Sequence, residues 1–174
     1  MLIVVSGLPG TGKSAVAAVL AGRLKAVHLS IDPIEDALRG AGLPPSWETG
    51  VGAYEAAREM TEQNLLLGHA VVVDAVNDSE PARGTWRLAA QRAGADLTFV
   101  LLTLADAEEH RRRLEGRARG LRHVPEPTWH QVQERAAGYV DWPDEDCLRV
   151  DAAPSVEEIV LAVHKTLTGK TPSF

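Results

Sequence analysis

The sequence is poor in features that would place the protein outside the cell or in a membrane. Its only cysteine is Cys147, so an intramolecular disulfide cannot form. No stretch approaches the roughly 20 apolar residues that a membrane-spanning helix needs. Residues 1–5 are apolar, but they lack a basic start and run into a glycine-rich loop, which favours a first strand over a signal peptide. We therefore expect a cytoplasmic protein with no membrane partner.

Excess basic charge and internal repeats are also lacking. The formal net charge is −6 at pH 7, which argues against a nucleic-acid partner. The chain has no repeat and no low-complexity segment, and 174 residues suit one domain with a sizeable core. We assign residues 1–168 to this domain and 169–174 to a flexible polar tail. Nothing in the composition indicates an oligomeric state.

What the sequence does contain, near its start, is a complete phosphate-binding motif, G-x-x-x-x-G-K-[ST]. Its glycines let backbone N–H groups approach a polyphosphate, Lys13 can reach the β- and γ-phosphate oxygens, and the Ser14 hydroxyl can bind Mg²⁺. An apolar run before the loop and a stretch of helix formers after it supply the expected strand, loop and helix. The motif therefore predicts binding of ATP and Mg²⁺. The predicted cofactor-binding residues of this loop are Gly7, Pro9, Gly10, Thr11, Gly12, Lys13 and Ser14.

Apolar runs alternate with helical patterns along the whole chain, which predicts an α/β fold with a parallel sheet covered by helices. The predicted strands are 2–5, 26–31, 70–73, 97–102 and 148–150. The predicted helices are 15–24, 33–40, 52–67 and 80–93, followed by helices that begin after Asp106, Thr128 and Ser155, where capping-box spacings occur.

Two aspartates follow predicted strands and should face the phosphate loop, because ligands in open α/β sheets bind outside the carboxyl ends of the strands. Asp32 is placed to act as a general base toward a substrate hydroxyl, or it is only the N-cap of the helix that continues with Pro33. Asp74 is placed to hold Mg²⁺, directly or through water, or to contact substrate, or it is only a turn former. Trp47, in a proline-rich break, is the best candidate for a substrate wall.

An arginine-rich stretch, 111–122, is predicted to begin on a helix and to continue into a glycine- and proline-containing excursion. Arginine is always charged and suits phosphoryl oxygens. Arg113 and Arg117 are four residues apart and would share a helix face. Such a run is usually a solvated surface, but beside a phosphate loop it favours a short helical lid at about 112–127 that closes over the nucleotide.

The motif spacing resembles the small phosphate-loop kinases of the AAA-33 group, which are related to chloramphenicol phosphotransferase and to the kinase domain of polynucleotide kinase. The resemblance runs from Leu2 to about Leu167 and rests on the phosphate loop, Asp32, the lid spacing and an Asp-x-x-Asn strand end. It implies a P-loop NTPase fold like that of nucleoside monophosphate kinases, with a five-stranded parallel sheet of order 2-3-1-4-5 flanked by helices.

The resemblance also implies roles for individual residues. Lys13, Asp32, Arg113 and Arg117 would be catalytic, with both arginines contacting ATP. The predicted substrate-contacting residues are Asp32, Trp47, Asp74, Asn77 and Arg83, and the predicted metal ligands are Ser14 and Asp74.

The sequence therefore predicts an ATP-dependent kinase that phosphorylates a hydroxyl group of a small molecule, such as an antibiotic-like compound or a metabolite. Relatives that act on polynucleotides often carry an arginine soon after the catalytic aspartate, whereas Glu35 and Asp36 stand there in this chain. This difference favours a neutral or cationic acceptor. The alternatives are a polynucleotide 5′-hydroxyl kinase and a nucleotide-dependent switch without an acceptor.

Overall fold

The protein is described by a computed structural model that covers residues 1–143 and 147–169. Its centre is a five-stranded sheet in which every strand is parallel to its neighbours, in the order β2-β3-β1-β4-β5. The predicted order 2-3-1-4-5 is confirmed. The strands are β1 (Leu2–Ser6), β2 (Val27–Ser30), β3 (Val71–Asp74), β4 (Leu97–Thr103) and β5 (Cys147–Asp151).

Seven helices are found in the described part of the chain. Their bounds are α1 (Lys13–Leu24), α2 (Ile31–Gly40), α3 (Trp47–Leu66), α4 (Glu80–Ala93), α5 (Ala107–Gly116), α6 (Trp129–Ala137) and α7 (Val156–Gly169). The predicted capping box at Thr128 is present, with Gln131 as its second member. The helix α3 begins five residues earlier than predicted, because the Ser46 side chain accepts from the Thr49 N–H and caps it. The predicted tail lies mostly outside the described residues.

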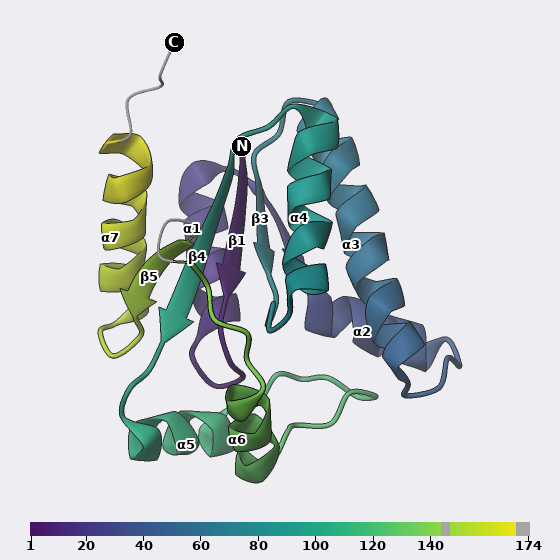
Figure 1. Cartoon of the computed structure of the whole chain (residues 1–174), viewed down its shortest axis with the longest axis vertical. Coiled ribbons are helices and arrows are strands. Elements are labelled where there is room, and N and C mark those ends of the chain that lie inside the picture. Colours follow the sequence, from purple (N-terminus) through teal and green to yellow (C-terminus); the bar gives the residue numbers. More distant parts are fainter. Residues whose placement is uncertain (144–146, 170–174) are drawn as a thin grey trace.

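The helices form a layer on each face of the sheet (Figure 1). One apolar cluster joins β1 and β3 to α1 and α7, and a second joins the opposite sheet face to α3 and α4. β1 and β3 are buried along their whole lengths, as expected for strands covered on both faces. The two layers fix the central strands, and therefore fix the loops at their carboxyl ends.

All strands point toward the same end of the molecule, where α5 and α6 lie across the ends of the sheet (Figure 1). The segment that joins these two helices, residues 117–128, contains no helix or strand. We call it the lid loop. The helical lid predicted for 112–127 is therefore wrong in its secondary structure, because α5 ends at Gly116 and the backbone of Arg117 is extended.

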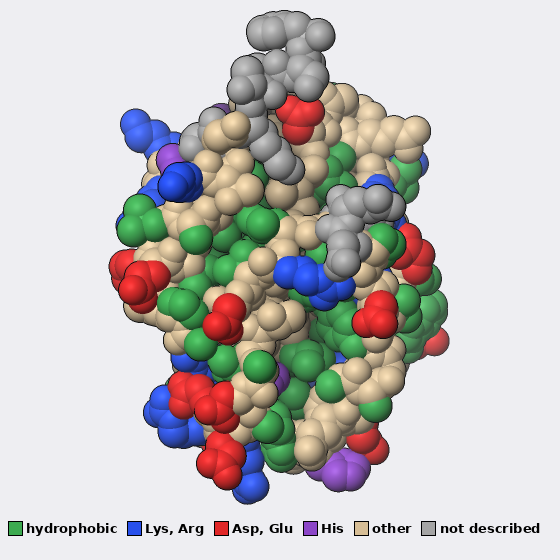
Figure 2. All heavy atoms as spheres, turned by 60° about the vertical axis from the view of Figure 1, so that its left-hand side comes forward, with side chains coloured by type: hydrophobic (Ala, Val, Ile, Leu, Met, Phe, Trp, Pro, Cys, Tyr) green, Lys and Arg blue, Asp and Glu red, His purple; other side chains and the backbone are tan. Residues whose placement is uncertain are grey.

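No described helix is both long and apolar enough to cross a membrane. The face toward α7 and β5 carries acidic and basic side chains around a hydrophobic middle (Figure 2).

Candidate functional site

The phosphate loop connects β1 to α1 and depends on glycine at two positions. Gly7 has φ 142°, and a Cβ there would lie 2.6 Å from the carbonyl oxygen of Leu102 on β4. Gly10 has φ 94°, and a Cβ there would meet the ring of His110 at 3.0 Å. A side chain at either position would force the loop away from its neighbours. The loop is thus held in a fixed shape, with its residues leading directly into the N-terminus of α1.

Lys13 is the first residue of α1 and is buried. Its Nζ donates to the carbonyl oxygen of Leu8 at 3.3 Å. Burial lowers the pKa of the Lys13 ammonium, while the nearby carboxylates of Asp32 and Asp74 favour its charged form. A buried ammonium that has one carbonyl partner among the described residues is suited to an incoming anion.

Asp74 ends β3 beside the phosphate loop and is 3% exposed. Its Oδ1 accepts from the Ser14 hydroxyl at 2.7 Å and from the Ser30 hydroxyl at 3.1 Å, and its Oδ2 lies 2.8 Å from Nε2 of His28. The predicted pairing of Ser14 with Asp74 is therefore present in space. Two oxygen donors at the start of α1 fit Mg²⁺, which prefers oxygen ligands. The sequence did not single out His28 and Ser30. The pattern of residues along β2 does not show that this strand lies beside β3, where Asp74 is.

Asp32 is the second residue of α2, and Ser30 occupies the N-cap position without a capping side-chain bond. The alternative that Asp32 is only the N-cap is therefore wrong. Its carboxylate instead forms an ion pair with Arg119 of the lid loop. This pair brings the end of β2 and the lid loop together at the mouth of the site.

Two cavities meet at Asp32. The proximal cavity, of about 440 Å³, is lined by Pro9 and Lys13 of the phosphate loop region and by the lid loop. The distal cavity, of about 600 Å³, lies between α2, α3 and the start of α4. Asp32 lines both. Groups bound in the two cavities can therefore contact the same carboxylate.

Arg117 and Arg119 line the proximal cavity, and both approach Glu126 within the lid loop. Nη2 of Arg117 is buried without a hydrogen-bond partner. Burial also lowers the pKa of Arg117, and the positive charge of Arg119 adds to this effect. These two guanidinium groups face the space beside Lys13 and can contact a polyphosphate.

The predicted shared helix face of Arg113 and Arg117 is not found. Arg113 and Arg117 do not share a helix face, because α5 ends between them. The Arg113 guanidinium donates to the carbonyl oxygens of Ala152 and Ala153 and binds Glu109, so it ties α5 to the loop after β5. Sequence reasoning missed Arg119, since nothing in the local run of arginines distinguishes it.

Asp36 anchors the lid loop to α2. Its Oδ1 accepts from three successive backbone N–H groups, those of Arg122, His123 and Val124, at 3.0, 2.7 and 2.9 Å. These bonds lower the pKa of the Asp36 carboxyl, the bond from His123 most strongly. Glu35, the neighbouring acid, is paired with Arg39. The Asp36 carboxylate is thus directed at the lid loop, and the preference for a neutral or cationic acceptor stays a prediction.

Comparison with known proteins identifies the family to which the chain belongs. The sequence profile of AAA_33, described as an AAA domain, matches residues 2–138. The chain belongs to the AAA_33 family. A search of curated proteins gives no match for the sequence.

Solved structures share the fold of this AAA_33 domain over nearly their whole length. A sugar kinase from Janibacter sp. HTCC2649 is 17% identical with a TM-score of 0.72, and covers 96% of this chain and 94% of its own. A gluconokinase from Sinorhizobium meliloti 1021 is 21% identical, with a TM-score of 0.68 and coverages of 98% and 97%. The APS kinase CysC from Mycobacterium tuberculosis, solved with AMPPNP and APS, is 22% identical, with a TM-score of 0.67 and coverages of 96% and 96%. At these identities the likeness shows a P-loop kinase-like fold, and the acceptor stays open.

Two predicted substrate residues of the AAA_33 domain are structural instead. Asn77 is fully buried and has φ 55°; it donates to the Ser6 hydroxyl at 2.8 Å and accepts from the indole N–H of Trp86 at 2.8 Å. Arg83 is 1% exposed, donates to the carbonyl oxygens of Asn77, Val140 and Asp141, and stacks on the Trp142 ring at 3.9 Å. Neither residue lines the proximal or the distal cavity.

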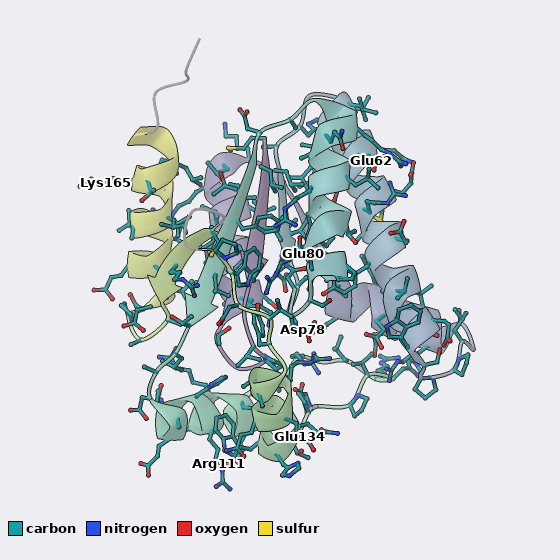
Figure 3. The ribbon with its side chains drawn as sticks, in the orientation of Figure 1. Glu62, Asp78, Glu80, Arg111, Glu134 and Lys165 are labelled. Carbon is teal, nitrogen blue, oxygen red and sulfur yellow. The ribbon has the colours of Figure 1, made fainter. Side chains whose placement is uncertain are left out.

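The distal cavity does contain the predicted Trp47, at the start of α3. It also contains residues that the sequence did not single out. Asp78 lies between the start of α4 and α6 (Figure 3) and pairs with Arg135 of α6 at 3.1 Å. Arg39 and Arg135 line both cavities. No local motif marks these residues, because their meeting depends on how α2, α4 and α6 pack.

Proposed function

We propose that this AAA_33 protein is an ATP-dependent kinase that transfers the γ-phosphate of ATP to a hydroxyl group of a small molecule, an antibiotic-like compound or a metabolite. One observation carries the proposal: Asp32 is shared by a cationic cavity beside the phosphate loop and by a second, roomy cavity. This is the arrangement that transfer between two ligands requires. The single Cys147 and the acidic net charge of −6 are compatible with work in the cytoplasm.

The residues of the site have two roles, binding of the polyphosphate and activation of the acceptor hydroxyl. Lys13, the loop amides, Arg117 and Arg119 bind the polyphosphate and offset the charge that develops during transfer. Asp32 accepts the proton of the substrate hydroxyl. At the same step the hydroxyl oxygen forms a bond to the γ-phosphorus of ATP, and the bond between that phosphorus and the ADP oxygen breaks. The ion pair of Asp32 with Arg119 must open for this step, and a phosphoryl group that attracts Arg119 would open it.

The fold family implies a magnesium ion with the nucleotide. Ser14 and Asp74 fit it, because a hydroxyl and a buried carboxylate lie 2.7 Å apart at the phosphate loop. When bound, Mg²⁺ would offset part of the negative charge of the phosphate groups. His28 and Ser30 hold the Asp74 carboxylate in place from β2.

Phosphorus NMR of ATP and Mg²⁺ with a library of hydroxylated metabolites and antibiotics tests the proposal. A new phosphomonoester signal together with ADP is expected. Lys13→Ala should abolish it, and Asp32→Asn should leave ATP affinity nearly intact while lowering transfer at least 100-fold, because a general base typically contributes that much. Asp96→Asn, on an exposed aspartate before β4, is the matched control.

The same experiment addresses the two alternatives. A 5′-hydroxyl oligonucleotide that becomes labelled faster than any small alcohol would replace the proposed acceptor class. ATP hydrolysis that no alcohol or oligonucleotide changes, and that Asp32→Asn does not slow, would contradict a kinase altogether.

A further inference from the structure

The two cavities have opposite charge character. In the described part of the chain, the charged residues that line only the proximal cavity are three cations, Lys13, Arg117 and Arg119, and one carboxylate, Glu126, which pairs with both arginines. Among the described residues that line only the distal cavity, the charged ones are Glu55 and Asp78, and none is a lysine, arginine or histidine. Positive charge thus gathers where the polyphosphate would bind, and carboxylates are found where the acceptor would bind.

The two arginines that border the distal cavity are already compensated. Arg39 pairs with Glu35, and it also donates to the carbonyl oxygen of His123 in the lid loop. Arg135 pairs with Asp78. Both arginines also line the proximal cavity. An anionic acceptor would find no uncommitted cation deeper in the distal cavity.

Glu55 is different, because its charge is only partly compensated. Its ion-pair partner is Arg58, at 2.8 Å, but Arg58 also approaches Glu59 and Glu62. Among the described residues, the further cation in this group is Arg92, which lies 3.6 Å from Glu62. Three carboxylates therefore share two guanidinium groups. Glu62 lies toward the far end of α3 from the region of Asp78 (Figure 3), which leaves Glu55 as the member that lines the cavity.

An apolar surface accompanies this carboxylate. Trp47, Val51 and Glu55 follow one another at intervals of four residues on α3, so they share a helix face about 12 Å long. All three line the distal cavity, as does Tyr54. Trp47 is 78% exposed. An indole left open to water beside a carboxylate is suited to covering an apolar body and to contacting a cation through its ring.

We infer that the acceptor is an amino alcohol with an apolar body, whose protonated amine is bound by Glu55 while its hydroxyl is presented to Asp32. The inference rests on the proposed kinase function for the phosphate-transfer step, but binding of the amine does not require transfer. A cavity of about 600 Å³ holds a compound of drug-like size.

Matched compounds test the charge preference. One set is 2-amino-1-phenylethanol, its N-acetyl derivative and mandelic acid, which share a phenyl ring and a benzylic hydroxyl but differ in charge. Larger aromatic alcohols can also be arranged in sets of an amine, a neutral and an anionic compound. Calorimetric binding in the presence of Mg²⁺ and AMPPNP, and phosphate transfer from ATP, are measured for each compound. The amine of a set is expected to bind at least tenfold more tightly than its neutral and anionic counterparts.

The structure offers a closely matched pair of variants. Glu55 and Glu59 both approach Arg58, and their side chains are 53% and 54% exposed, yet only Glu55 lines the distal cavity. Glu55→Gln should reduce the amine preference about tenfold without changing binding of the N-acetyl compound. Glu59→Gln should leave both unchanged.

The outcomes separate the inference from the proposed function. Tighter binding of amines without any phosphate transfer supports the inference and contradicts the kinase function. Transfer to neutral or anionic alcohols in preference to amines keeps the kinase function and overturns the inference. An amine preference that Glu59→Gln lowers as much as Glu55→Gln, or a panel in which no amine binds, also overturns it.

Discussion

At the scale of single residues, the site depends on Asp32 and on the lid arginine that contacts it. Asp32 stands at the meeting point of the two cavities, and Arg119 reaches it from a segment that is 87 residues distant in sequence. The Arg119 guanidinium also binds Glu126 and the carbonyl oxygen of Pro125. It is thus held between the base and the lid loop, in a position to contact phosphate.

Arg119→Gln is therefore expected to lower kcat for phosphate transfer by about 10² to 10³, the usual loss when one group that stabilises transition-state charge is removed. Arg122→Gln is the matched control, since the Arg122 side chain is exposed and its contact with Asp36 of α2 is made by its backbone N–H. Steady-state kinetics of both variants would check this. Equal turnover by the two variants would mean that Arg119 has no part in transfer.

The residues that the sequence could and could not identify differ in a physical way. The phosphate loop and Asp74 follow from a motif and from the rule that strand ends share one edge of the sheet. The spacing of Arg113 and Arg117 predicts a shared face only if the helix continues past Gly116, where α5 ends, and it gives no sign of Arg119. Burial of Asn77 and Arg83 could not be predicted, because it depends on residues distant in sequence: Ser6 for Asn77, and residues 139–142 for Arg83.

At the scale of elements, α2 connects the acceptor side to the lid loop. Asp32 and Asp36 are four residues apart on this helix, so they lie on the same face, and both contact the lid loop. The order of strands and helices was predictable from alternating apolar and helical patterns. The path of the lid loop was not, because it is fixed by contacts with α2 rather than by its own sequence pattern.

Asp36→Ala is expected to release residues 122–124 from α2 and to raise KM for ATP several-fold, because the proximal cavity would lose one wall. Amide hydrogen exchange should rise at these three residues, and Asp36→Asn should restore part of the protection, since an amide oxygen still accepts. Asp96→Ala serves as the control. Unchanged exchange at 122–124 in Asp36→Ala would show that other contacts hold the lid loop.

This attachment also has a defined pH dependence. The three backbone N–H groups lower the pKa of Asp36 below its ordinary value of 3.8, so the folded state favours the carboxylate. The stabilisation is therefore fully present above pH 3.8 and is lost as the pH falls through the lowered pKa. Amide chemical shifts of residues 122–124 should stay constant from neutral pH to about pH 4 and change only below it.

At the scale of the whole molecule, Arg83 links parts of the chain that are distant in sequence. From α4 it donates to carbonyl oxygens of Asn77, after β3, and of Val140 and Asp141, which precede β5. Its guanidinium also stacks on Trp142, whose ring packs against Phe99 of β4. One buried cation therefore contacts α4, the loop after β3 and residues 140–142, which follow α6.

Arg83→Met should remove these donors and leave buried carbonyl oxygens unpaired, with a loss of about 2–4 kcal/mol in the free energy of unfolding. Urea denaturation measures it, and Arg87→Met, on the same helix but more exposed, should lose much less. If Arg83→Met does not fold, Arg83→Lys gives a smaller loss that can still be measured. The variant that folds should keep the KM for the acceptor, because Arg83 lines neither cavity; a raised KM with full stability would instead make Arg83 a substrate residue.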